Sequence, residues 1–159
     1  MKRGFTLVEL ASVMVVVSIL AITAAPVLSR VADTRREALA GEVERVLALA
    51  RSRALTTGLP AGVRVDVGSQ TLGLLEKPEG SSPRAFMEAY VVPQRISGVT
   101  ISSFINEERT DSVWFAPDAT PHARSDAGVF LADLTVEATI SIEGGPTVRI
   151  EPNSGRITR

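Results

Sequence analysis

The chain opens with a long apolar stretch and continues with apolar positions at helical spacing. From Leu10 to Leu28 no residue carries a formal charge, so this stretch is long enough to cross a bilayer as a helix. Farther along, apolar residues recur every three or four positions, which is typical of one helix face. This apolar stripe consists of Leu39, Val43, Val46, Leu47, Ala50 and Ala54. The two patterns predict one helix from Phe5 to Thr57, ended by Gly58 and Pro60.

Two features modify the predicted helix. Pro26 lacks a backbone N–H group and should kink the helix without ending it. Charged side chains between Arg35 and Arg53 fall opposite the apolar stripe and predict a solvated face.

After Gly58 the apolar period changes from 3.6 to 2, which is typical of half-buried strands. Turns are expected at 143–146 and 153–155, and variable surface loops at 77–84 and 116–128. Strands in series after one long helix predict an α+β fold, with an antiparallel β-sheet head packed on the apolar stripe. The expected strands are 63–67, 71–76, 99–105, 112–115, 135–142 and 147–150, followed by a short terminal segment.

Composition narrows the functional classes. Seventeen Lys and Arg against eighteen Asp and Glu leave the chain of 159 residues nearly neutral, so global charge does not indicate nucleic-acid binding. Cysteine is absent, which removes disulfides, thiolate metal sites and a cysteine nucleophile. No catalytic residue and no cofactor are expected.

The single histidine lies in a weak candidate metal cluster. Asp118, His122 and Asp126 are ligand types, but their spacing matches no known metal geometry. We therefore predict a solvated loop and no metal. Trp114 and Phe115, on an expected strand, are interpreted as core residues.

Glu9 stands at the edge of the apolar stretch, where a lone carboxylate is costly and indicates a function. A secretory signal would have a shorter apolar region and a better cleavage site than Ala24-Ala25 before Pro26. A plain membrane anchor, with Lys2 and Arg3 keeping the N-terminus cytoplasmic, leaves Glu9 unexplained. A third interpretation starts from the glycine that follows the two basic residues.

The stretch "RGFTLVEL" resembles the class III signal of type IV pilins and type II secretion pseudopilins. The matching residues are Gly4, Phe5, Thr6, Leu7, Glu9 and Pro26. The resemblance implies that a prepilin peptidase cuts between Gly4 and Phe5 and N-methylates Phe5.

The same resemblance implies a role for Glu9 in filament assembly. In a bundle of apolar helices an unpaired carboxylate is penalised and a paired one is tolerated. Cleavage frees the ammonium of Phe5, and Glu9 lies one helical turn farther along. A neighbouring subunit could therefore bring its amine to this carboxylate, which would set the axial register and couple processing to assembly.

Two segments of the head are similar to the GspH/FimT branch of minor pilins and pseudopilins. They are "VWFAPD" (113–118) and the terminal "SGRITR" (154–159). The resemblance implies a place at or near the filament tip and help in priming assembly, in either a type IV pilus or a type II secretion pseudopilus. That branch often has glycine where Ala119 or Thr120 stands, which leaves the turn geometry open.

The resemblance also implies a domain plan and partners. We expect a leader at 1–4, a transmembrane helix at 5–28, its amphipathic continuation at 29–57 and a periplasmic head at 58–159. The expected partners are other minor and major pilins or pseudopilins, the prepilin peptidase, the inner-membrane assembly platform and inner-membrane lipid.

DNA uptake through the C-terminus is the alternative function. Some FimT-type minor pilins use a Gly-Arg-x-Arg patch, and Gly155, Arg156 and Arg159 offer one with an extra residue between the arginines. In a strand the two arginines would point to opposite faces, even with Arg149 nearby. Loss of Lys2 and Arg3 with the leader would also leave an excess of acidic side chains. A structural Gly-Arg turn is therefore favoured, and nucleic acid is the less favoured partner.

Overall fold

The computed structural model divides the chain into two compact units, Met1–Thr34 and Arg35–Arg159. Helix α1, Leu7–Thr57, runs through both units. The second unit, here called the head unit, therefore contains the last turns of α1 together with the strands. The structure describes residues 6–66, 71–78, 82–85, 90–91, 101–105, 108–109, 112–125 and 127–159.

Helix α1 ends where the sequence predicts. The N–H group of Gly58 donates to the carbonyl of Ala54 at 3.1 Å, and Gly58 has φ +67°. This left-handed conformation suits glycine and ends the helix after Thr57. The helix also continues past Pro26. The side chain of Pro26 lies outside the described residues, so the expected kink stays a prediction.

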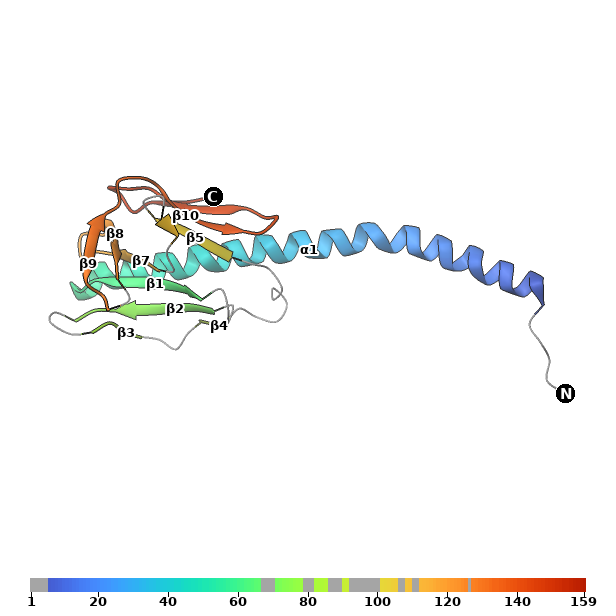
Figure 1. Ribbon diagram of the computed structural model, residues 1–159, viewed down its shortest axis with the longest axis horizontal. Helices are drawn as coiled ribbons and strands as arrows, with labels where there is room; N and C mark the ends of the chain where they lie inside the picture. Colours follow the sequence, from blue (N-terminus) through green and yellow to red (C-terminus); the bar gives the residue numbers. More distant parts are fainter. Residues whose placement is uncertain are drawn as a thin grey trace. The chain divides into compact units, whose positions relative to one another are not determined.

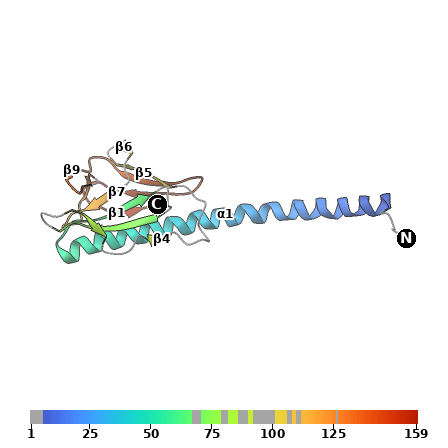
Figure 2. The ribbon, with the colours of Figure 1, turned by 60° about the horizontal axis from the view of Figure 1, so that its bottom comes forward.

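The strands of the head unit pair in the antiparallel sense, as predicted, and they form two sheets. The first has the order β3-β2-β1-β7-β8-β9 with β4 beside β2, and the second has the order β12-β11-β10-β5-β6. Figures 1 and 2 show the C-terminal part of α1 alongside the strands of this unit. The bounds are β1 Ala61–Asp66, β2 Thr71–Glu76, β3 Arg84–Ala85, β4 Tyr90–Val91, β5 Ile101–Ile105, β6 Glu108–Arg109, β7 Ser112–Phe115, β8 Pro121–Arg124, β9 Phe130–Asp133, β10 Ala138–Ile142, β11 Thr147–Ile150 and β12 Ile157–Thr158.

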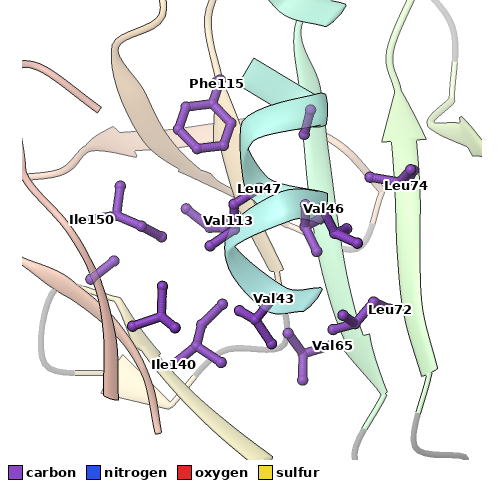
Figure 3. Packing of buried hydrophobic residues seen from close by; sticks show 14 of the residues in the cluster. Val43, Val46, Leu47, Val65, Leu72, Leu74, Val113, Phe115, Ile140 and Ile150 are labelled. Atoms are coloured by element: carbon purple, nitrogen blue, oxygen red, sulfur yellow. The ribbon is translucent and has the colours of Figure 1, made fainter. Parts of the chain in front are cut away.

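The apolar stripe of α1 fills the space between the two sheets. Every residue of the predicted stripe is buried, and all belong to one hydrophobic cluster with both sheets. Figure 3 shows Val43, Val46 and Leu47 between the side chains of Ile140 and Ile150 on one side and those of Leu72 and Leu74 on the other. Trp114 and Phe115 are also buried, as predicted. Each sheet therefore covers one flank of the helix, and burial of this apolar surface is the main stabilising contribution.

The expected loop at 116–128 contains a strand, which corrects the prediction for His122. Strand β8 pairs with β7 in the register Trp114↔His122 and Phe115↔Pro121. His122 is 1% exposed, so it does not lie in a solvated loop. The segment Pro121–Arg124 lacks β-branched residues and has proline at its first position, so strand propensity gave no signal. Asp126, the third candidate ligand, lies outside the described residues.

The turn before β8 forms without the glycine that the GspH/FimT branch often has at position 119 or 120. Ala119 adopts φ +70°, in the left-handed region that glycine favours, and its N–H donates to the Ala116 carbonyl at 2.8 Å. The carboxylate of Asp118 accepts hydrogen bonds from the backbone N–H and the hydroxyl of Thr120, at 3.0 and 2.6 Å. The pKa of Asp118 is lowered by these bonds. The hydrogen bonds of Asp118 to Thr120 thus stabilise a turn in which Ala119 takes the left-handed conformation.

Candidate functional site

Glu9 caps the first turn of α1. The N–H and the hydroxyl of Thr6 both donate to Oε2 of Glu9, at 2.9 and 2.8 Å, and the N–H of Glu9 donates to Oγ1 of Thr6 at 3.3 Å. This reciprocal arrangement is a capping box, in which two otherwise unsatisfied helix donors find acceptors. The sequence interpretation missed it, although Thr6-Leu7-Val8-Glu9 has the spacing that would have revealed it. Glu9 therefore has a role within its own chain.

The capping box leaves part of the Glu9 carboxylate for a second donor. Both hydrogen bonds from Thr6 use Oε2, and among the described residues no donor reaches Oε1. The residue is exposed at the start of a helix, where the helix dipole favours negative charge. An ammonium group from outside the chain could therefore bind this carboxylate without breaking the cap.

Polar side chains deeper in the apolar stretch are satisfied within the helix. The hydroxyl of Ser12 donates to the Val8 carbonyl and that of Ser18 to the Met14 carbonyl, each at 2.8 Å. A hydroxyl that donates to the backbone carbonyl four residues earlier in the same helix needs no water molecule as its acceptor. The protons of these two hydroxyls are therefore used within the helix, and Glu9 is the charged group among the described residues of this stretch.

Large apolar side chains between residues 7 and 22 of the helix stay uncovered in the single chain. Each is more than half exposed: Leu7, Val8, Leu10, Val13, Met14, Val15, Val16, Val17, Ile19, Leu20 and Ile22. An exposed apolar surface of this extent is typical of a segment that contacts lipid or other apolar helices. Within the part of the chain that the structure describes, none of the helices was found to combine the length and apolarity of a membrane span.

Two of the predicted site residues precede the described part of the chain. Gly4 and Phe5, the proposed cleavage and methylation positions, come before the first described residue, Thr6. Their assignment stays a prediction, and the structure contributes the position of Glu9 one turn into the helix.

At the other end of the chain, Arg159 binds α1 and is not free on the surface. Its Nε and Nη2 donate to the two carboxylate oxygens of Glu44 at 2.6 and 3.2 Å, and its Nη1 donates to Glu37 at 3.0 Å. We call this set the C-terminal latch. Hydrogen bonds to Glu44 raise the pKa of Arg159 further above its already high ordinary value. The predicted solvated face of α1 is therefore partly occupied by the chain's own C-terminus.

The other two candidate arginines are arranged differently. Arg149 pairs with Glu137 at 3.0 Å. Arg156 is exposed and follows a turn in which Gly155 has φ +62° and its N–H donates to the Glu151 carbonyl at 3.1 Å. Gly155 also packs so closely that a Cβ there would overlap the carbonyl oxygen of Ala119. The structure thus contains a Gly-Arg turn, and it pairs Arg149 and Arg159 with separate carboxylates.

Comparisons with known proteins were made for both the N-terminus and the fold. Residues 1–25 match the family model of the prokaryotic N-terminal methylation motif. The structure is similar to the minor pseudopilin EpsH from the type 2 secretion system of Vibrio cholerae. One EpsH structure has a TM-score of 0.53 at 15% identity and covers 78% of this chain and 94% of that one. The chain has the fold of a minor pseudopilin.

A crystal structure of the EpsH minor pseudopilin is similar as well, with a TM-score of 0.56 at 12% identity over 79% of this chain and 95% of that one. Curated protein sequences gave no match. The range matched by the methylation motif includes Gly4, Phe5 and Glu9. The pseudopilin fold and the methylation motif therefore rest on two different comparisons, and together they confirm the resemblance drawn from the sequence.

Proposed function

We propose that this chain is a structural subunit, a minor pilin or pseudopilin, of a filament assembled from the inner membrane. The observation that carries the proposal is Glu9, a carboxylate whose Oε1 no donor among the described residues reaches, one turn into an exposed apolar helix that bears the methylation motif. The apolar stretch would lie in lipid before assembly and among other subunit helices afterwards. The head would then lie in the periplasm, and the chain would have no enzymatic activity.

Processing would precede assembly. A prepilin peptidase would cut between Gly4 and Phe5 and methylate the amine of Phe5. We expect Gly4→Val to block cleavage, because a β-branched side chain stiffens the backbone and crowds the scissile position. Intact-mass measurement would find Met1 to Gly4 retained in this variant and removed in a control, Val8→Ala. A mature terminus near Ala25 in the wild type would contradict the proposal and favour an ordinary signal peptide.

The methylated amine of one subunit would then pair with Glu9 of a neighbour. Two variants separate this pairing from the capping role. Glu9→Gln keeps a side chain that can close a capping box but removes the charge, whereas Thr6→Val removes the capping hydroxyl and keeps the charge.

Co-purification of membrane-inserted chain with partner subunits distinguishes the two roles. We expect weak recovery for Glu9→Ala, intermediate recovery for Glu9→Gln and near wild-type recovery for Thr6→Val. If Glu9→Gln is recovered like the wild type while Thr6→Val is lost, Glu9 acts only as a helix cap and the register mechanism is wrong.

The place in the filament would be at or near the tip, where the chain helps other minor subunits to prime assembly on the inner-membrane platform. Similarity in fold to a minor pseudopilin supports the role of a minor subunit, and the tip position rests on the sequence resemblance to the GspH/FimT branch. Gold labelling of an epitope in the head should mark filament ends. Labelling along the whole length would identify a major subunit instead.

DNA uptake is the weaker alternative, because carboxylates of the chain already pair with Arg149 and Arg159. Binding of duplex DNA to the full chain at low and moderate salt tests it. Affinity that falls steeply with salt and disappears in Arg156→Ala but not in a control, Arg53→Ala, would favour DNA binding over the purely structural role.

A further inference from the structure

The single histidine belongs to a polar cluster on the buried strand β8, which pairs with the exposed strand β9. Nε of Arg124 donates to Nε2 of His122 at 2.7 Å, and Nη1 of Arg124 donates to the carbonyl of Gly128 at 2.8 Å. The guanidinium carbon lies 5.6 Å from the ring centroid of Trp114, within cation–π range. One arginine thus connects strand β7, strand β8 and the turn that leads to β9.

This geometry fixes the protonation of the imidazole. An arginine side chain has only donors, so Nε2 of His122 must be an unprotonated acceptor. The proton of the neutral ring is therefore on Nδ1, which lies 3.5 Å from the Thr120 carbonyl oxygen.

Several groups act on the protonation of His122. Burial is the largest cause and the positive charge of Arg124 the second, and together they lower the pKa of His122 from about 6.5 to about 4. The backbone of Thr120 and the carboxylates of Asp133 and Asp118 act in the opposite direction. The ring of Phe130 also lies 5.6 Å from the imidazole. The neutral ring is thus the stable form at ordinary pH.

The hairpin held by Arg124 carries three of the exposed large apolar residues of the head unit. Val129, Phe130 and Leu131 are 57%, 50% and 61% exposed, and β9 is the last strand of its sheet. The turn has its own bonds, from the Gly128 N–H to the Ser125 carbonyl and from the Ser125 N–H to the Val129 carbonyl, at 2.7 and 2.9 Å. Arg124 is the side chain that ties this turn back to the buried face of β8.

We propose that His122 and Arg124 form a proton-sensitive clasp that fixes the β8–β9 hairpin over Trp114. Protonation of Nε2 would place an N–H donor and a positive charge against the N–H groups of the guanidinium. The hydrogen bond would then be lost, and Arg124 would leave both the indole and the Gly128 carbonyl. The hairpin would be fixed when His122 is neutral and released when it is charged. This clasp is independent of the proposed filament role.

Trp114 is the only tryptophan of the chain and therefore reports directly on the clasp. We would measure its emission between pH 7 and pH 3.5 on the full chain in detergent micelles, with far-UV circular dichroism as a check on global unfolding. The wild type should show an emission change with a midpoint near pH 4 and no parallel loss of circular dichroism.

Two variants define the origin of that change. His122→Gln offers a carbonyl oxygen to Arg124 and does not titrate, so its emission should stay constant over the same range. Arg149→Gln, which removes an exposed arginine outside the cluster, should behave like the wild type. The proposal is overturned if His122→Gln shows the wild-type transition, or if the wild type shows none.

Nuclear magnetic resonance of the wild type gives a test that needs no variant to fold. With one histidine in the chain, the imidazole nitrogens give one set of signals. We expect the neutral ring to be protonated on Nδ1 at pH 7 and to titrate well below pH 6. A proton on Nε2, or titration near pH 6.5, would contradict the clasp.

Discussion

Lowering the pH should destabilise the head unit through His122, and the size of the effect follows from two pKa values. The imidazole titrates near pH 6.5 in an unfolded chain and near pH 4 in the folded protein. Between these values the unfolded chain binds more protons, so the free energy of unfolding falls as the pH falls. The contribution is fully present above pH 6.5, and the gap between the pKa values corresponds to a loss of roughly 3 kcal/mol by pH 4.

The assay is urea unfolding of residues 35–159, which form a compact unit with its own hydrophobic core. Many carboxylates titrate in the same range, so the quantity of interest is the difference between the wild type and His122→Gln. We expect this difference to be constant above pH 7 and to shift by roughly 3 kcal/mol in favour of the variant by pH 4. A difference independent of pH would show that burial does not hold His122 in its neutral form, and the reasoning would fail.

Three further substitutions test other contacts of the head unit. Gly155→Ala should cost more than about 2 kcal/mol in urea unfolding, because the left-handed conformation is unfavourable for alanine and its Cβ overlaps the Ala119 carbonyl. A cost below about 0.5 kcal/mol would mean that the turn rearranges freely. Arg159→Gln should cost about 1 kcal/mol, the upper range for exposed ion pairs, because three hydrogen bonds hold the latch. Arg156→Gln is its matched control and should be neutral, and equal costs for the two variants would contradict a latch at Arg159.

Local patterns predicted the helix and the strands β1, β2, β5, β7, β10 and β11, but not β3, β4, β6, β8 and β9. The apolar stripe and Gly58 located the core face and the end of α1, because helical periodicity and a left-handed terminating glycine act over a few residues. The capping box was equally local, and it was missed because Glu9 was interpreted only through the resemblance. The Thr-x-x-Glu spacing at residues 6–9 is sufficient by itself to predict the cap.

Features that join distant segments could not be predicted in this way. Arg159 meets Glu44, which lies 115 residues earlier in the chain, and neither residue carries a signal for the other. Strand β8 exists because it pairs with β7, although its own residues favour a turn. The burial of His122 follows from that pairing. His122 and Arg124, which the sequence placed in a solvated loop, are therefore part of a folded strand, and only the tertiary structure shows it.

The two ends of the chain are constrained by different physical demands, which explains why each was recognised by a different comparison. The first 25 residues match a motif in sequence, whereas the agreement with EpsH is in structure, over 78–79% of the chain at only 12–15% identity. A core formed by a helix stripe between two sheets needs apolar residues of suitable volume, and many combinations satisfy it. The proposed cleavage after Gly4 and the proposed pairing of Glu9 with an amine would instead need particular atoms at particular positions. Volume-conserving exchanges such as Ile140→Leu in the core should therefore leave the fold intact, whereas the conservative change Glu9→Gln is expected to weaken assembly and to leave the fold intact.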